Sequence, residues 1–134
     1  MTKERPTIRV VAAVIRRGDR YLITQRREKA VLPLLWEFPG GKVEEGESDD
    51  EALKREVRFR IGVEVEAGEL ISYQAHPYDH YVLDLYTYEC RIVGGEPTGQ
   101  NVHDFRWVKS DEFDSFPFTP ADEKSVAKLL GLEE

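Results

Sequence analysis

The sequence predicts a mixed α/β fold in a single domain spanning residues 1–134. Short segments rich in β-branched residues alternate with two helical segments, an order typical of strands and helices that pack in layers. A chain of 134 residues, 40% of them apolar, is long enough to bury one hydrophobic core. No repeat, linker or low-complexity segment divides the chain.

The first part of the chain indicates a hairpin followed by irregular backbone. Residues 7–15 are apolar and rich in valine and isoleucine, which favours a buried strand. A turn and a second apolar segment at residues 21–24 complete the predicted hairpin. Residues 28–35 are expected to form a loop, and the Pro-Gly-Gly sequence at residues 39–41 predicts a sharp break in the backbone.

The clearest element is a helix over residues 48–61. Ser48 and Glu51 form the S-x-x-E capping box at its start. Gly62 follows the last helical residue and is expected to end the helix. Apolar residues recur at every fourth position and are expected to face the core: Leu53, Val57 and Ile61.

The second half of the chain predicts strands followed by a closing helix. Residues 63–73 and 80–93 are rich in strand-forming side chains, and the turn at residues 94–97 ends the second of them. A short strand is expected at residues 105–108, and an amphipathic helix at residues 120–130. The apolar side of this last helix is expected to be formed by Val126, Leu129 and Leu130.

Charge and composition exclude several classes of protein. The chain has 19 Lys and Arg against 26 Asp and Glu, a net charge of −7, so unspecific binding to nucleic acid is not expected. No apolar run reaches the roughly 18 to 20 residues of a membrane helix. The first ten residues lack a hydrophobic signal core, so we expect a cytoplasmic protein with no membrane partner. The only cysteine, Cys90, excludes an internal disulfide and a multi-cysteine zinc site.

Residues 40–63, GGKVEEGESDDEALKREVRFRIGV, resemble the signature of the Nudix family, G-x5-E-x7-R-E-U-x-E-E-x-G-U, in which U is aliphatic. Seven of its nine defined positions match at the right spacing: Gly41, Glu47, Arg55, Glu56, Val57, Gly62 and Val63. Residues 36–42, WEFPGGK, also resemble the segment that MutT-like members carry before the signature. Later Arg-Trp-Val, Phe-Pro and Pro-Ala-Asp segments extend the resemblance over nearly the whole chain.

The resemblance implies the Nudix fold, a mixed β-sheet sandwiched between helices. Members hydrolyse a nucleoside diphosphate linked to another group, and they use Mg²⁺ or Mn²⁺ held by the signature helix. The FPGG and PAD segments resemble members that act on cytidine or oxidised nucleotides. The resemblance therefore implies a pyrophosphohydrolase that cleaves nucleoside triphosphates to monophosphate and pyrophosphate. The implied partner is therefore a nucleotide rather than nucleic acid, and the protein is expected to be a monomer or a homodimer.

The same resemblance implies which residues carry the chemistry. Glu56 is expected to be the main metal ligand, because a hard dication takes several oxygens at close range. Glu47 and the carbonyl oxygen of Gly40 are expected to join it. Glu47 and Glu44 are expected to assist catalysis or to act as the base, and Arg55 to orient these carboxylates.

Each candidate substrate contact has a structural alternative. Arg26 either meets phosphate or lies exposed at the end of a strand. Asp122 either reads the base or is an ordinary acidic residue in the first turn of the last helix. Phe118 either stacks on the base or belongs to the core.

Two signature positions depart from the family pattern, since Phe59 and Arg60 stand where the paired glutamates are expected. Phe59 has no oxygen to offer, and Arg60 puts a permanent cation beside the expected metal. A third departure is Asn101, six residues before Trp107, where many MutT-like members carry another Glu. Arg60 either pairs with Glu56 one helical turn away or binds phosphate through its guanidinium.

Three functions therefore stay open. The first is a nucleoside triphosphate pyrophosphohydrolase whose metal-dependent activity is weakened by the loss of two glutamates, or retained because nearby carboxylates suffice. The second is a catalytically inactive protein that binds nucleotides. The third is a structural or partner-binding protein, in which the acidic loop is only a solvated surface.

Overall fold

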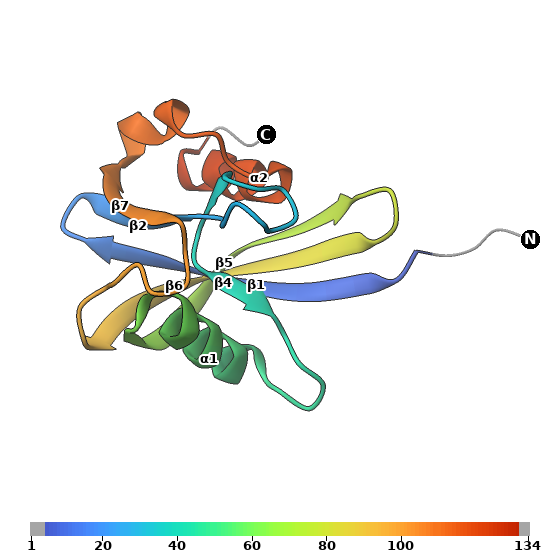
Figure 1. Cartoon of the computed structure of the whole chain (residues 1–134), viewed down its shortest axis with the longest axis horizontal. Helices are drawn as coiled ribbons and strands as arrows, with labels where there is room; N and C mark the ends of the chain where they lie inside the picture. Colours follow the sequence, from blue (N-terminus) through green and yellow to red (C-terminus); the bar gives the residue numbers. More distant parts are fainter. Residues whose placement is uncertain (1–4, 132–134) are drawn as a thin grey trace, which may run out of the picture.

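A computed structural model describes residues 5–131 and confirms the mixed α/β fold. A curved mixed sheet forms the middle layer, with α1 on one face and α2 on the other (Figure 1). The elements follow one another in the order β1 (Thr7–Arg17), β2 (Arg20–Gln25), β3 (Trp36–Glu37), β4 (Gly40–Lys42), α1 (Asp49–Ile61), β5 (Glu64–Pro77), β6 (Val82–Gly94), β7 (Asp104–Lys109), the 3₁₀ helix η1 (Ser110–Ser115) and α2 (Pro120–Leu129). Between residues 5 and 131, no helix is long and apolar enough to cross a membrane.

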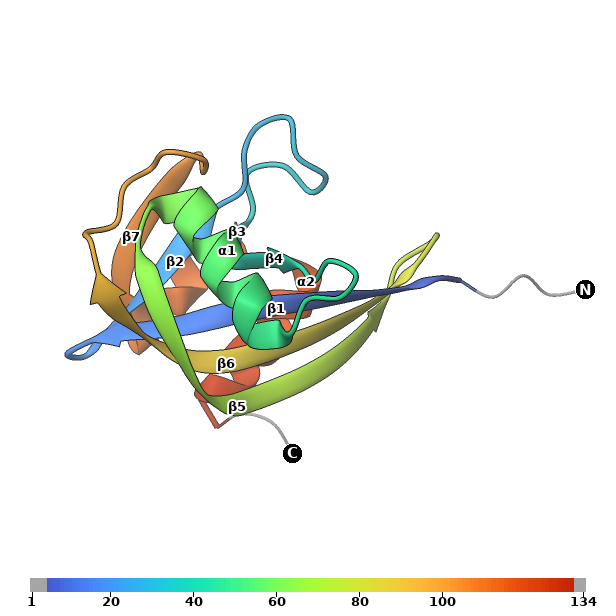
Figure 2. The same cartoon turned by 90° about the horizontal axis from the view of Figure 1, so that it is seen from below.

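The strand β1 is the centre of the sheet, whose path runs β3-β2-β1-β6-β5. It pairs in parallel with β6, from Thr7 opposite Val82 to Ile15 opposite Cys90. The end of β1 pairs antiparallel with β2, which in turn pairs with β7. The short β4 also pairs antiparallel with β1. Figure 2 shows α1 lying across the face formed by β1, β5 and β6.

Alternation along β1 separates two hydrophobic cores. Val11, Ala13 and Ile15 belong to the core under α1, whereas Ala12 and Val14 belong to the core under α2. Successive side chains of a strand point to opposite faces of the sheet. All five are at most 2% exposed, so the uninterrupted apolar run of the sequence reflects a strand that is covered by helices on both faces.

The predicted first helix is confirmed, with α1 beginning one residue after Ser48. The Oγ of Ser48 accepts a hydrogen bond from the N–H of Glu51, and the Glu51 carboxylate accepts one from the N–H of Ser48. Gly62 ends the helix in the left-handed conformation, at φ 73°. The three predicted apolar positions are fully buried: Leu53, Val57 and Ile61.

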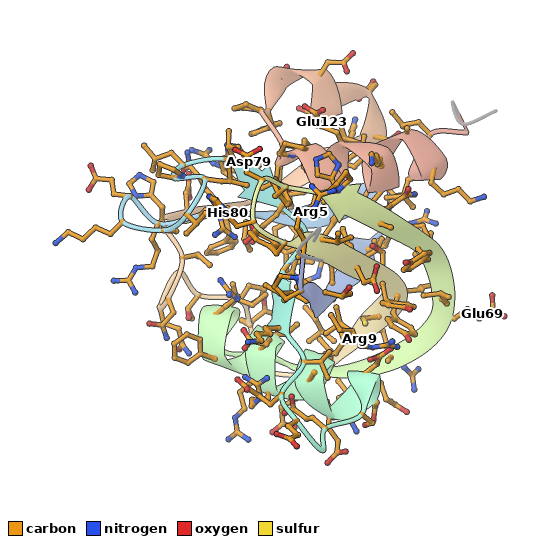
Figure 3. All side chains as sticks on the ribbon, turned by 90° about the vertical axis from the view of Figure 1, so that its right-hand side faces the viewer. Arg5, Arg9, Glu69, Asp79, His80 and Glu123 are labelled. Carbon is orange, nitrogen blue, oxygen red and sulfur yellow. The ribbon has the colours of Figure 1, made fainter. Side chains whose placement is uncertain are left out.

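Arg9 fixes the beginning of α1 to the sheet. It lies on β1 beside the first turn of the helix (Figure 3), and its Nε and Nη2 donate to the two carboxylate oxygens of Asp49 at 2.8 and 2.7 Å. The hydroxyl of Tyr88, on β6, also donates to Asp49. These bonds lower the pKa of Asp49, with Arg9 as the main cause. The helix that carries the signature is therefore anchored to two strands.

One segment differs from its prediction for a clear steric reason. Gly40–Lys42 is not only a break in the backbone but the strand β4. A β-carbon at Gly40 would lie 1.9 Å from the carbonyl oxygen of Val11. Only glycine lets the backbone approach β1 this closely. The sequence patterns also do not predict the 3₁₀ helix η1.

The helix α2 packs on the sheet through small and polar residues. Ala121, Asp122 and Ser125 are buried, and Ser125 shares a hydrogen bond of 3.2 Å with Thr87 of β6. The residues predicted to form its apolar side are only partly buried against the second core: Val126, Leu129 and Leu130. The helix is close to its predicted bounds, but the face that it buries is not the most apolar one.

Candidate functional site

A cavity of about 390 Å³ lies between β1, β4, β6 and the first turn of α2. This volume is within the range of small-molecule sites. Apolar side chains from β1 and β6, including Val10, Leu83 and Leu85, line part of it. The charged side chains that line it are Arg26, Glu37, Lys42, Arg60 and Asp122. Four of the site residues predicted from the sequence line this cavity: Arg26, Gly40, Arg60 and Asp122.

Beside the cavity, Arg55 joins two glutamates of the signature. Its Nε and Nη2 donate to Glu47 at 2.6 and 2.8 Å, and its Nη1 donates to Glu56 at 2.6 Å. Nη2 also donates to the carbonyl oxygen of Lys42 at 2.9 Å, which ties α1 to β4. Arg55 is thus placed to orient both carboxylates, as the resemblance implies.

The side chain of Glu47 is held in its ionised carboxylate form. The hydrogen bonds from Arg55, together with one of 2.9 Å from the backbone N–H of Glu44, lower the pKa of Glu47 to about 2. Such a group is a weak base, because a good general base has a pKa near the working pH. Glu44 contributes its backbone to this arrangement, while its side chain is exposed.

Arg60 pairs with Glu56, one of the two alternatives that the sequence leaves open. Its Nε donates to Oε2 of Glu56 at 3.2 Å, across one turn of α1. Phe59, the other departure from the signature, is 56% exposed on the same helix. The guanidinium of Arg60 therefore contacts the carboxylate that the resemblance implies as the main metal ligand.

Asn101 caps the end of α1. Its Nδ2 donates to the carbonyl oxygen of Phe59 at 2.7 Å. Its backbone N–H donates to the carbonyl oxygen of Arg60 at 3.0 Å. The neighbouring Gln100 donates from Nε2 to the carbonyl oxygens of Arg58 and Phe59. The last carbonyl groups of a helix lack partners within the helix, and this loop supplies them.

The side chains as they lie do not fit the divalent ion that the resemblance implies. Within residues 5–131, no three His, Cys, Asp or Glu side chains gather closely enough to hold a metal ion. Arg55 and Arg60 take one oxygen each of Glu56, and Arg55 takes both oxygens of Glu47. A dication such as Mg²⁺ needs about six oxygens in its shell, and these oxygens already accept hydrogen bonds from guanidinium groups.

Asp122 lines the cavity and is only 6% exposed. Its Oδ1 accepts from the N–H of Phe38 at 3.2 Å, and its Oδ2 accepts from the hydroxyl of Thr119 at 2.6 Å. Burial, and next the nearby charge of Glu37, raise the pKa of Asp122 to about 7. Asp122 is therefore both a cavity residue and the link between α2 and the segment that precedes β4.

Phe118 lies in the core, which is the alternative to base stacking that the sequence leaves open. Phe118 is 6% exposed and belongs to the core under α2. Its ring packs against those of Phe38 and Phe113, at centroid distances of 5.9 and 5.7 Å. Because the ring is buried among other aromatic rings, little of its surface is open to a ligand.

Comparison with known proteins identifies the family. The sequence model of the NUDIX domain matches residues 10–128. This chain belongs to the Nudix family. It is 35% identical over 129 residues to the 8-oxo-dGTP diphosphatase of Haemophilus influenzae, covering 95% of this chain and 94% of that protein. It is 33% identical over 125 residues to the CTP pyrophosphohydrolase of Escherichia coli, covering 93% of each.

A solved structure agrees with this assignment. The DNA mismatch repair protein MutT of methicillin-resistant Staphylococcus aureus 252 matches this Nudix protein with a TM-score of 0.76. The two are 35% identical, and the match covers 97% of this chain and 100% of that one. The resemblance read from the signature is thus confirmed for the family and for the fold.

Sequence reasoning missed two charged residues of the cavity in this Nudix protein, Glu37 and Lys42. Glu37 accepts a hydrogen bond of 3.1 Å from Nη1 of Arg26, whose Nε donates to the carbonyl oxygen of Val31. Burial raises the pKa of Glu37, and Arg26 and Arg60 partly oppose this shift. Both residues stand inside the WEFPGGK segment, where two charged side chains among aromatic residues, proline and glycine were the available signal.

Proposed function

We propose that this Nudix protein hydrolyses nucleoside triphosphates slowly, releasing a nucleoside monophosphate and pyrophosphate. The relatives described above are an 8-oxo-dGTP diphosphatase and a CTP pyrophosphohydrolase. Both names denote action on a nucleoside triphosphate. Each match covers more than nine-tenths of this chain, which supports the same class of substrate here.

The observation that carries the proposal is the contact between the signature network and the strand that lines the cavity. Gly40, Gly41 and Lys42 of β4 line the cavity. A β-carbon at Gly41 would lie 2.3 Å from Oε2 of Glu56, so this carboxylate lies directly against β4. A nucleotide in the cavity would therefore lie next to Glu56.

The proposed reaction gives each part of the site a task. The oxygen of a water molecule bonds to phosphorus, the anhydride P–O bond breaks, and pyrophosphate departs while the proton of the water passes to a base. Glu56 is the carboxylate beside the cavity, so we assign proton acceptance to it rather than to Glu47. Arg26 faces the phosphates, and Asp122 meets the edge of the base.

Slow turnover follows from the residues around Glu56. Both of its oxygens accept hydrogen bonds from arginines, so one of these bonds must be given up before Glu56 can accept a proton from water. Phe59 and Arg60 also replace the two glutamates that the family pattern has. Removing one group that stabilises charge in a transition state commonly costs on the order of 10² to 10³ in rate.

The test is pyrophosphate release from CTP, dCTP, ATP, dGTP and 8-oxo-dGTP, measured with Mg²⁺ and with EDTA. We expect slow release of pyrophosphate and monophosphate in equal amounts under both conditions, and at least about tenfold less from the Glu56→Gln variant. Glu66→Gln is the matched control, because Glu66 pairs with Arg91 on the surface, outside the cavity lining. No release from any nucleotide, or equal release by Glu56→Gln, would refute the proposal.

A second candidate function is nucleotide binding without turnover. It is favoured by the ion pair of Arg60 with Glu56 at 3.2 Å, which leaves this carboxylate without a free oxygen. Calorimetric titration with the same nucleotides distinguishes the two functions. Binding with no product in a prolonged incubation supports the second candidate, whereas product formation supports the first.

A further inference from the structure

We propose that Arg60, with Arg26 and Lys42, binds the polyphosphate of a nucleotide without any divalent cation. This inference rests on the proposed function only for the choice of a nucleoside triphosphate as ligand. The three cationic side chains come from α1, from the end of β2 and from β4, and all three line the same cavity. Arg60 supplies, in place of a metal ion, the positive charge that contacts both the carboxylate of Glu56 and the phosphates of the ligand.

The hydrogen bonds of Arg60 leave most of its guanidinium available. Only its Nε is engaged, by Oε2 of Glu56. Neither Nη1 nor Nη2 has a hydrogen-bond partner among residues 5–131. A guanidinium has five N–H donors in a planar fork that matches phosphate oxygens. Glu56 thus fixes the orientation of Arg60 while its two Nη groups stay free for a ligand in the cavity.

Arg26 and Lys42 add to the positive charge. The ion pair of Arg26 with Glu37 uses Nη1, so Nη2 is left without a partner within the described chain. The side chain of Lys42 makes no ion pair with any described residue.

The balance of charge in the cavity favours an anion. Arg26, Lys42 and Arg60 line the cavity together with two carboxylates, those of Glu37 and Asp122, so cations outnumber anions in the lining although the chain as a whole carries −7. The charge of Glu56, next to β4, is shared between Arg55 and Arg60. A triphosphate is the kind of anion that such a lining attracts. A magnesium ion bound to the triphosphate would reduce the negative charge of the triphosphate. The ion would therefore not strengthen the attraction between the triphosphate and the three cationic side chains.

The test is calorimetric titration of the full chain with the α,β-methylene analogue of CTP, which is not cleaved, and with inorganic triphosphate. In excess EDTA we expect both probes to bind. Arg60→Gln should weaken binding by about tenfold or more, because it removes charge-assisted hydrogen bonds. Adding Mg²⁺ should leave the affinity of the unaltered protein equal or lower.

The matched control is Arg58→Gln, the same change two residues earlier on α1. Arg58 does not line the cavity and pairs with Glu64 at the surface, so binding should stay within about twofold. Arg60→Lys keeps the charge and should bind the probes more tightly than Arg60→Gln; equal affinity would contradict the inference. Binding only with Mg²⁺, or equal metal-free binding by Arg60→Gln and the unaltered protein, would overturn it. Absence of turnover would instead count against the proposed hydrolysis alone.

Discussion

Gly41 and Glu56 are in direct contact where β4 meets α1, since a β-carbon at Gly41 would lie 2.3 Å from the Oε2 of Glu56. The adjacent Gly40 is just as close to another group, the carbonyl oxygen of Val11, at 1.9 Å. A β-carbon at Gly41 would therefore meet the end of a side chain, which can move, whereas a β-carbon at Gly40 would meet the backbone of β1, which is fixed by the sheet.

This difference predicts different results for two alanine substitutions. Gly40→Ala should lower the free energy of unfolding by about 2 to 4 kcal/mol, because β1 would have to shift. Gly41→Ala should cost about 1 kcal/mol or less, because the Glu56 carboxylate can move away. Urea denaturation measures both. The control is Gly99→Ala, whose β-carbon would make only an ordinary contact with Phe105 at 4.0 Å. Equal losses for Gly40→Ala and Gly41→Ala would contradict this account.

Restoring the family glutamates should restore metal-dependent catalysis. The double variant Phe59→Glu and Arg60→Glu places two new carboxylates beside Glu56 and removes the guanidinium from its Oε2. We expect pyrophosphate release with Mg²⁺ to rise by about 10² or more. Mg²⁺ should also raise the melting temperature of the double variant, because the ion binds only the folded site.

A surface variant controls for added negative charge in this experiment. Arg58→Glu changes the charge of the same helix at an exposed position and should neither gain activity nor be stabilised by Mg²⁺. If the unaltered protein already turns over rapidly and the double variant is no faster, the idea of a weakened site is wrong. If neither turns over, Asn101 is the next position to restore as Glu.

The buried Asp122 should make stability depend on pH. Its folded-state pKa is about 7 against 3.8 for the ordinary group, so the folded chain holds a proton that the unfolded chain has lost. The contribution of Asp122 to the free energy of unfolding is fully present below about pH 4, where both states carry the proton. It is lost as the pH rises to about 7, because the buried carboxyl group must then ionise. Asp122→Asn cannot lose a proton, so its stability relative to the unaltered protein should improve between pH 5 and pH 8, by at least about 1 kcal/mol.

Urea denaturation of both proteins at several pH values checks this prediction. The neighbouring Glu123→Gln is the control, because Glu123 is exposed and should show no such trend. A difference between Asp122→Asn and the unaltered protein that stays constant from pH 5 to pH 8 would show that Asp122 is ionised in the folded state throughout.

Asp122 is also expected to affect the choice of base. Asp122→Asn keeps an oxygen for the N–H of Phe38 but replaces the other oxygen by an amide nitrogen, so the hydrogen bonds offered to a base edge change. The ratio of affinities for CTP and dGTP should shift by about tenfold or more, while the affinity for inorganic triphosphate stays nearly unchanged. Calorimetry measures both, with Glu123→Gln again as the control. Equal weakening of every nucleotide, or of none, would show that Asp122 does not read the base.

Local features of this protein were predictable because their causes lie within a few residues of each other. The capping box of Ser48 and Glu51, the end of α1 at Gly62 and the burial of Leu53 depend on the spacing of side chains along one helix. The pairing of Arg60 with Glu56 belongs to the same class, since residues four apart on a helix are neighbours.

Other features depend on residues that are distant in the sequence. The sequence leaves Phe118 either to stack on a base or to join the core, and it is the packing against Phe38 and Phe113 that places its ring in the core. No pattern near Asp49 indicates that Arg9, 40 positions earlier, would bind it. The role of Asn101 as a cap of α1 likewise depends on a loop that returns to the end of that helix.

The sequence by itself determined the family, the positions of both helices and the identity of the signature residues, because motif spacing and helix periodicity are properties of the chain alone. Only the tertiary structure decided which charges share the cavity. Glu37, Arg60 and Asp122 come from three separate elements, and the burial of Asp122 arises when α2 closes over the sheet. Desolvation and Coulomb interaction depend on distances through space, so the protonation of Asp122 follows from the fold.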